Sequence, residues 1–390
     1  MPFSTQLDAY EHNSERRDMS KLKKAMKALK GNDNVDLKET VVDLDPTAQV
    51  PAISTGSVVL DYLIGGHRMD NGKKRCPGIP RGRITELFGG EGAGKTTVAI
   101  HTAIQCQKQG GSIAFIDFEH AFAPTYAHDL GLDTQADTFT LFQPHHYESG
   151  ASLIEACADA GVDLIIVDSV AAMKPKTAIE DKEVSNTGQI GHIARLQSDF
   201  IPKILKKVKA SGTALIYINQ LRHRIKTSMY DTGPDEETSG GRALKYYASL
   251  RLSLSKSTTE YTKVESEMTG KKDKQPVSNI VRAKNVKNKV SRHQGHTAEF
   301  VIRYGEGVDN VRSVIDIAAA RDVINRAGAW YKFPGTDGKE VKCQGRENLR
   351  QHFVANQDDF HNIVSQIQFS KGADKLGEVD GDNIEVEEGK

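Results

Sequence analysis

Short apolar runs alternate with amphipathic stretches through the middle of the chain. The apolar runs predict strands, and the amphipathic stretches predict helices. Strands are expected at 84–88, 113–116, 164–167 and 214–218, and helices at 97–109, 153–159 and 193–209. Short, continuous apolar strands that alternate with helices are typical of a parallel sheet. The pattern therefore predicts an α/β fold with a mostly parallel sheet.

The N-terminal segment has a helical pattern of its own. Apolar residues recur at helical spacing between about Asn13 and Lys30, and a short strand is expected at 40–44. The helix either packs on the chain's own core or docks on a neighbouring subunit. Spacing alone favours the first interpretation.

The chain changes character near residue 244. Residues 244–254 are rich in strand-forming residues, 256–278 predict a long exposed hairpin, and the residues from 371 onward are acidic and poor in apolar side chains. Such an acidic stretch is typical of a disordered tail. We therefore predict four parts: a helix and strand at 1–50, a core at 51–310, a small α+β domain at 311–370 and the tail at 371–390.

Composition limits the possible partners and locations. Lys and Arg together number 52 and so do Asp and Glu, so any nucleic-acid surface must be local rather than a property of the net charge. The four cysteines form no CxxC pair, which argues against zinc-ribbon and thioredoxin-like proteins and favours a reducing cytoplasm. No signal peptide and no apolar run of about 18–20 residues is found, so we expect no membrane partner.

The loop after strand 84–88 matches the phosphate-binding pattern GxxxxGK[ST]. Its residues are Gly89, Gly90, Glu91, Gly92, Ala93, Gly94, Lys95 and Thr96. Glycines let backbone N–H groups approach phosphates, and the next helix directs its positive end at them. In this pattern Lys95 reaches the β- and γ-phosphates and the Thr96 hydroxyl binds Mg²⁺. The alternative, an ordinary glycine-rich turn, fits the strand–loop–helix context poorly.

Two further strands end in carboxylates. Strand 164–167 leads into Asp168, which would help to hold the metal ion. Strand 113–116 leads into Asp117, with Glu119 just beyond it. Glu119 is either the base that activates water or an ordinary loop acid, and position alone leaves the two about even. These parts predict an ATPase without saying what the ATP is used for.

Several other stretches resemble bacterial RecA-type recombinases, in family order from about residue 50 to 335. They include Ile53-Ser54-Thr55-Gly56-Ser57, Phe115-Ile116-Asp117-Phe118-Glu119-His120-Ala121, Ile166-Val167-Asp168-Ser169-Val170-Ala171-Ala172, Ile218-Asn219-Gln220-Leu221-Arg222, Gly240-Gly241-Arg242-Ala243-Leu244-Lys245-Tyr246-Tyr247-Ala248-Ser249, Val286-Lys287-Asn288-Lys289, Tyr304-Gly305-Glu306-Gly307 and Ala327-Gly328-Ala329-Trp330-Tyr331. A generic phosphate-loop protein would share only the first site and the strand that ends at Asp168. Cellular and phage-encoded members of the family both fit the sequence.

The resemblance implies roles at the ATP site. Glu119 would be the catalytic base, and Gln220 would sense the γ-phosphate. Tyr126 would stack on adenine, and Thr97 would join the nucleotide site. The implied cofactors are ATP and Mg²⁺.

Two lysines are implied to act on a different subunit. Lys287 and Lys289 would reach a neighbouring subunit's ATP in a helical homo-oligomeric filament and neutralise charge in the transition state, as an arginine finger does. Without the resemblance, both would be interpreted as solvated charges on an edge strand.

The resemblance also implies two DNA-binding loops. The first, at about 180–190, includes Ile190 and leads into the helix that carries Arg195 and Ser198. The second, at about 221–239, includes Arg222 and Ile225 and ends at Gly240-Gly241-Arg242. Basic groups would hold phosphates, while Ile190 and Ile225 would wedge between bases. The alternative is a pair of mobile surface loops with scattered charge.

Other implied surfaces serve duplex DNA and assembly. The resemblance makes the helix and strand at 1–50 polymerisation elements that would pack on the adjacent subunit, and Tyr246 would also lie near that interface. The region around Trp330 resembles the small domain that handles double-stranded DNA. The acidic tail would compete with DNA for basic surface or serve solubility alone.

The sequence departs from the family pattern in a few places. The family usually has an acid at the position of Ala123, which puts adenine recognition in doubt. The first DNA loop, at 183–187, lacks the sequence motif that is usual in the family. Segments 67–78 and 256–278 are longer than the common pattern.

Taken together, the sequence predicts an ATP-dependent recombinase that forms filaments on single-stranded DNA and exchanges strands with a duplex. The first alternative is a hexameric helicase or another motor ATPase with a RecA core. The second is a non-catalytic recombination mediator, which should have a damaged phosphate loop or lack Glu119.

Overall fold

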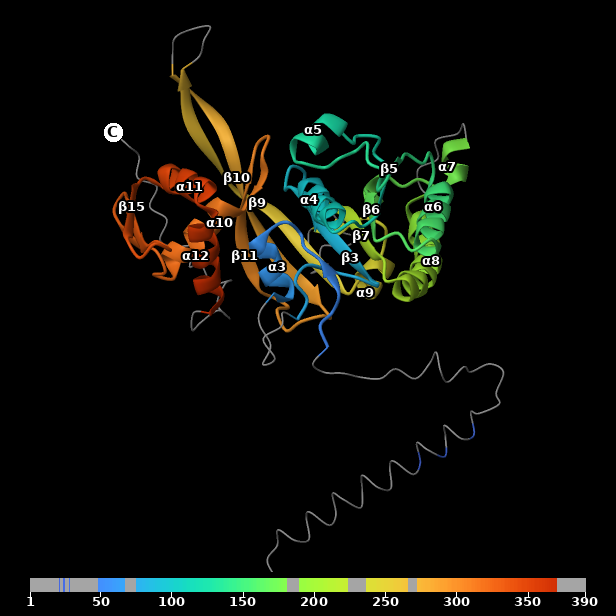
Figure 1. The fold of residues 1–390 in the computed structure, drawn as a ribbon. Helices are drawn as coiled ribbons and strands as arrows, with labels where there is room; N and C mark the ends of the chain where they lie inside the picture. The colour runs from blue at the N-terminus through green and yellow to red at the C-terminus, as the bar shows by residue number, and fades with distance from the viewer. Residues whose placement is uncertain are drawn as a thin grey trace, which may run out of the picture. The chain divides into compact units, whose positions relative to one another are not determined.

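The computed structural model describes residues 48–66, 75–180, 189–223, 236–265 and 272–369, together with Lys21, Lys24 and Ala28 (Figure 1). The chain divides into two units, Met1–Ala48 and Gln49–Lys390, and the architecture below is that of the second. Several predictions fall outside the described residues: most of the helix at 13–30, the strand at 40–44, most of segment 67–78, most of both DNA loops, the tip of the hairpin and the tail from 371.

A ten-stranded sheet forms the centre of this unit, in the order β12-β11-β10-β9-β3-β7-β6-β4-β5, with β8 paired to β7. Its strands are β3 (Arg83–Gly89), β4 (Ile113–Asp117), β5 (Phe139–Phe142), β6 (Leu164–Asp168), β7 (Ala214–His223), β8 (Glu236–Thr238), β9 (Leu250–Glu265), β10 (Lys272–Asn288), β11 (Thr297–Arg303) and β12 (Gly307–Asp309). The strands from β9 to β5 in this order are parallel, and β10, β11 and β12 extend the sheet with antiparallel pairs. The predicted α/β class with a mostly parallel sheet is confirmed.

Helices cover both faces of the sheet because its central strands are apolar on both sides (Figure 1). On β6, Leu164 and Ile166 belong to one core, while Ile165 and Val167 belong to the other. The first core contains residues of α3 and α4, and the second contains residues of α6, α8 and α9. The helices are α3 (Val58–Gly65), α4 (Lys95–Lys108), α5 (Pro124–Asp129), α6 (Tyr147–Asp159), α7 (Lys176–Glu180), α8 (Gln189–Ser211) and α9 (Ala243–Tyr247), with a 3₁₀ turn η1 (Val170–Ala172) and a small pair β1 (Ala52–Ile53) and β2 (Ile79–Pro80).

Two elements differ from the sequence prediction. Helix α6 begins at Tyr147, earlier than the predicted 153, because the His146 ring accepts a hydrogen bond from the backbone N of Ser149 and caps the first turn. The region expected to be strand-rich from Leu244 begins with the helix α9, and β9 starts only at Leu250. Within Ala243–Tyr247, alanine, leucine and lysine favour a helix while the two tyrosines favour a strand, so the local propensity does not decide.

The C-terminal residues surround a hydrophobic core of their own, which includes Ile315, Leu349, Phe353 and Ile363. The elements here are α10 (Asn310–Ala320), β13 (Asn325–Ala327), β14 (Trp330–Pro334), β15 (Glu340–Gln344), α11 (Arg346–Ala355) and α12 (Gln357–Phe369). This mixture of helices and a three-stranded sheet agrees with the α+β character expected here. The four boundaries proposed from the sequence stay predictions.

Arginine–carboxylate pairs join this C-terminal part to the long hairpin of β9 and β10. Arg312 of α10 is only 7% exposed, and it contacts Glu260 of β9 at 2.7 Å and Asp316 of its own helix. Arg346 lies 3.8 Å from the same Glu260. A buried guanidinium needs such partners because an unpaired buried charge is costly.

No helix in the described part of the chain has both the length and the apolar content needed to cross a bilayer.

Replacing Arg312 with Met should destabilise the protein by about 2 kcal/mol, less than for a fully buried ion pair because Glu260 and Asp316 are partly exposed. Urea unfolding followed by circular dichroism measures this change. Lys339→Met is the matched control, since its pair with Asp337 is exposed at 3.7 Å and should contribute less than about 0.5 kcal/mol. Equal effects of the two substitutions on the free energy of unfolding would show that the ion pairs of Arg312 do not stabilise the contact between the C-terminal part and the hairpin.

Candidate active site

The carboxyl ends of four parallel strands bring the candidate residues together. Gly89 at the end of β3 lies opposite Gln220 of β7, and Asp117 at the end of β4 lies opposite Asp168 at the end of β6. Ligands of open α/β sheets bind at this edge, where the loops after the strands converge. The register thus places all four residues at one edge of the sheet.

The loop between β3 and α4 turns through left-handed glycines. Gly92 has φ 68° and Gly94, which caps α4, has φ 82°. A side chain at Gly94 would also collide with Ile302. Lys95 turns its ammonium back into the loop, where Nζ donates to the carbonyls of Gly89 at 3.1 Å and Gly90 at 2.6 Å. The arrangement holds a cation beside the N-terminus of α4, which suits an anionic ligand.

Asp168 and Thr96 form a polar pair beneath the loop. The Thr96 hydroxyl donates to Asp168 Oδ2 at 2.8 Å. Burial raises the pKa of Asp168 to about 6, although Thr96 and Lys95 oppose the shift. Burial also lowers the pKa of Lys95. A hydroxyl and a carboxylate in contact at a phosphate-binding loop are the oxygen ligands that Mg²⁺ takes, so these residues fit the metal predicted from the sequence.

Glu119 is held by the side chains of Gln220 on β7 and of Ser169, which directly follows β6. Its Oε1 accepts from Gln220 Nε2 at 2.8 Å and from the Ser169 hydroxyl. The loop that carries it is fixed by Asp117, which accepts from the backbone N of Glu119 at 3.1 Å and from Gln143 Nε2 at 3.1 Å. The carboxylate is therefore oriented toward Gln220 at the same edge as Lys95.

Tyr126 lies beside the first turn of α4. Its hydroxyl is 3.0 Å from Thr97 Oγ1, so the two residues predicted for the nucleotide site are in contact. Ala123, where the family usually has an acid, is the N-cap of α5 and offers no side-chain hydrogen bond to that helix. The Tyr126 hydroxyl is thus held from the α4 side.

Lys287 and Lys289 lie at another part of the sheet. Lys287 is opposite Arg251 of β9, which is opposite Glu86 of β3, so the lysine, two strands away from β3, is level with the middle of that strand rather than with its carboxyl end. Its Nζ donates to the carbonyls of Lys245 and Tyr246, both at 2.7 Å. Burial, with the charges of Lys289 and Arg251, lowers the pKa of Lys287 to about 8.

The described ends of the second predicted DNA loop lie against η1 and α8. Arg222 donates to the carbonyl of Ala171 at 3.1 Å. Gly240 and Gly241 have φ of 84° and 79°, and a Cβ at Gly241 would approach Ala194 of α8 to 2.8 Å. The end of the second loop therefore packs against the helix that follows the first loop.

The other residues predicted to bind DNA are only partly described. Arg195 and Ser198 are exposed on α8, and Arg242 is the N-cap of α9. Ile225 and the side chain of Ile190 lie outside the described residues.

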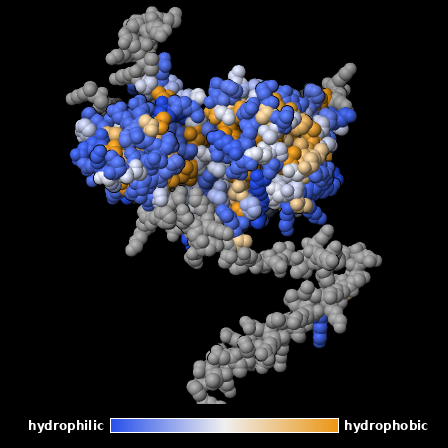
Figure 2. All heavy atoms as spheres, viewed as in Figure 1, coloured by the Kyte–Doolittle hydropathy of each residue, from blue (hydrophilic) through white to orange (hydrophobic). Residues whose placement is uncertain are grey.

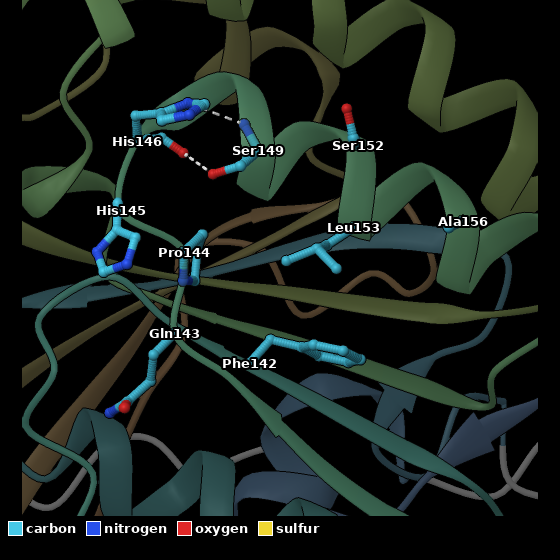
Figure 3. A pocket seen from close by; sticks show the side chains of 9 residues that line it. All are labelled: Phe142, Gln143, Pro144, His145, His146, Ser149, Ser152, Leu153 and Ala156. Carbon is cyan, nitrogen blue, oxygen red and sulfur yellow. Dashed lines mark hydrogen bonds between the residues drawn. The ribbon is translucent and has the colours of Figure 1, made fainter.

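A hollow of about 650 Å³ lies beside the site, between the end of β5 and the first turns of α6 (Figure 3). Phe142, Pro144, Leu153 and Ala156 give it an apolar lining. Apolar side chains also gather on the viewed face in the region where Figure 1 draws β5 and α6 (Figure 2). Gln143 of the same lining bonds to Asp117, so the hollow shares a wall with the site.

Sequence reasoning missed three residues that orient the site: Ser169, Gln143 and Asn219. Ser169 and Asn219 each stand next to a residue that was assigned a role, which was the available signal. Gln143 follows β5 and has no motif around it.

Comparison with known proteins gives two family matches. The family model of the RecA N-terminal domain matches residues 22–309, and that of the RecA C-terminal domain matches residues 312–371. Protein RecA of Campylobacter jejuni subsp. doylei is 38% identical over 363 residues, which cover 92% of this chain and 96% of the relative. Protein RecA of Staphylococcus carnosus is 38% identical over 341 residues, covering 87% and 86%. Protein RecA of Paracoccus denitrificans is 37% identical over 345 residues, covering 88% of each.

Binding of ATP with Mg²⁺ should weaken as the pH falls through about 6, because Asp168 then becomes protonated and loses its charge. Above that pH the carboxylate is ionised and able to bind a cation. Fluorescence titration of a non-hydrolysable ATP analogue, with and without Mg²⁺, measures this from pH 5 to 8. In Asp168→Asn, Mg²⁺ should increase the affinity for the ATP analogue only slightly at every pH. If Mg²⁺ increased the affinity of the wild-type protein for the analogue equally above and below pH 6, the expectation would be contradicted.

Proposed function

The chain belongs to the RecA family, and we propose that it hydrolyses ATP at the edge of the sheet that carries Lys95, Asp168 and Glu119. Its family makes it a recombinase of DNA recombination and repair, and a DNA-dependent ATPase. The hexameric helicase is not favoured, because models of both RecA domains match and the relatives align over most of the chain.

In the proposed reaction the phosphates of ATP lie in the loop after β3. Lys95 leaves the carbonyls of Gly89 and Gly90 and donates to phosphate oxygens instead. Bound between Thr96 and Asp168, Mg²⁺ would neutralise phosphate charge. Glu119 accepts a proton from water as the water oxygen bonds to the γ-phosphorus, and the bond to the β–γ bridging oxygen breaks to release ADP.

The observation that carries the proposal is the hydrogen bond between Gln220 and Glu119 at 2.8 Å. Gln220 lies on β7, which continues into the second DNA loop. A shift of Gln220 toward the γ-phosphate would move the start of that loop and release Glu119 for water. One bond therefore connects the state of the nucleotide with the proposed DNA surface.

We propose that Arg222, Ile225 and Gly240-Gly241-Arg242 of the second loop, with Ile190, Arg195 and Ser198 near the first, hold single-stranded DNA. Basic groups would bind its phosphates and the isoleucines would separate bases. The C-terminal part around Trp330 would bind the duplex partner. We propose the cytoplasm as the location.

A filament is part of the proposed function because Lys287 and Lys289 lie away from the ATP site of their own subunit. Lys287 and Lys289 would complete the ATP site of a neighbouring subunit. An interface that joins two different faces repeats from subunit to subunit and produces a helical polymer when it does not close. Tyr246, which is 66% exposed next to Lys287, would be covered in such an interface.

ATP hydrolysis by the purified chain should rise strongly when single-stranded DNA is added. Lys95→Ala should abolish it through lost nucleotide binding. Glu119→Gln should lower kcat by about 100-fold or more while nucleotide still binds, since general base catalysis contributes that much. A phosphate-release assay measures both, and Glu299→Gln, on an antiparallel strand away from the site, is the matched control. Hydrolysis that does not depend on DNA would favour a site that is complete within one subunit.

Mixing two inactive variants tests the neighbour's lysines. Lys287→Ala/Lys289→Ala lacks the lysines, and Glu119→Gln lacks the base, so each filament alone should be inactive. In an equal mixture, roughly one interface in four should pair an intact base with intact lysines and restore about a quarter of wild-type hydrolysis. If the mixture recovered no hydrolysis, Glu119 and the two lysines would act within the same subunit, or the lysines would not belong to an ATP site.

A further inference from the structure

Glu86 is a carboxylate at the centre of the sheet with no exposure to solvent. It lies on β3, and its side chain is 0% exposed. Its Oε2 accepts from Arg251 Nε, and its Oε1 accepts from Asn219 Nδ2 at 2.9 Å. Burial of a charge is costly unless it is paired and hydrogen-bonded. An apolar residue would fill this position in a purely structural sheet at lower cost.

Asn219 connects Glu86 to the site. Its Nδ2 also donates to the carbonyl of Ser239 at 3.0 Å, and its Oδ1 accepts from the backbone N of Gln220 at 2.9 Å. Both ends of the amide are therefore engaged, and its orientation is fixed. Ser239 ends the second DNA loop, and Gln220 bonds to Glu119. Asn219 thus holds the two ends of that loop at a common point.

Arg251 connects Glu86 to the opposite side. Its guanidinium lies 4.6 Å from the centre of the Phe88 ring, and its strand position is opposite Lys287. Arg251 helps to lower the pKa of Lys287, while Glu86 opposes that effect. The carboxylate therefore offsets two neighbouring cations, one of which is a lysine that we assign to the next subunit's ATP.

We propose that Glu86 is a positioning residue that, through Asn219 and Arg251, couples the lysine side of the sheet to Gln220 and the end of the second DNA loop. The proposal rests on the function proposed above. Glu86 touches neither nucleotide nor DNA, and it acts by fixing where Gln220 stands relative to Glu119. A subunit that docks on Lys287 would then change the same buried pair that holds Gln220.

Glu86→Gln tests this role because it keeps the shape and removes the charge. The new amide also turns a donor toward Arg251 or toward Asn219, so one of the two bonds is lost. We expect DNA-stimulated kcat to fall at least about tenfold, as for a misplaced catalytic group. ATP affinity should stay within about twofold because the phosphate loop is not touched. Glu299→Gln is the matched control, since it removes a partly exposed partner of an arginine, Arg282 at 3.1 Å, in the same sheet.

A second variant separates positioning from stability. Glu86→Gln leaves Arg251 without a charged partner, whereas Glu86→Met/Arg251→Met removes both charges and should regain thermal stability, while Asn219 still lacks its acceptor at position 86. Under our proposal the double variant regains its melting temperature but not its DNA-stimulated kcat. Recovery of kcat together with stability, or a Glu86→Gln single variant with wild-type stimulation, would overturn the positioning role. A wild-type chain without DNA stimulation would instead overturn the proposed function, and the positioning role with it.

Discussion

The site depends on the hydrogen-bonded register of four parallel strands. β3, β7, β6 and β4 are neighbours in the sheet, and their pairing sets Gly89 beside Gln220 and Asp117 beside Asp168. A slip of one residue in any strand would turn its side chains to the opposite face. Since each of these strands is packed in both hydrophobic cores, such a slip would also disrupt the packing of both cores. The cores that fold the protein thereby fix the polar atoms of the site.

The charged side chains at the carboxyl ends of these strands are buried, which is unfavourable in free energy unless they have polar partners. Asp117, Asp168 and Lys95 are all less than 9% exposed, and desolvation disfavours the charged form of each. Each has partners from another element, such as Thr96 for Asp168 and Gln143 for Asp117. Burial raises the pKa of Asp168 to about 6, which fits a carboxylate whose partner in the working state is a cation.

The sequence predicted the parts of the site that are local along the chain. The strand, loop and helix from 83 to 108 follow each other directly, so pattern and glycine spacing were enough. Contacts that cross the sheet were not predictable in the same way. Ser169 reaches Glu119 across 50 positions and Asn219 reaches Glu86 across 133, and no periodicity records which strands become neighbours. The start of α9 was mispredicted because its five residues are too few to show a helical period.

A division of the ATP site between two subunits follows from the position of Lys287 if the proposed roles hold. The lysine is fixed by two carbonyls of α9 level with the middle of β3, whereas Lys95 and Glu119 lie at the carboxyl end. Two rigid elements of one sheet cannot exchange places, so a single subunit cannot bring both groups to one phosphate. Assembly is then a condition of hydrolysis rather than a consequence of it. The buried pair of Glu86 and Arg251 is a polar connection between these two ends.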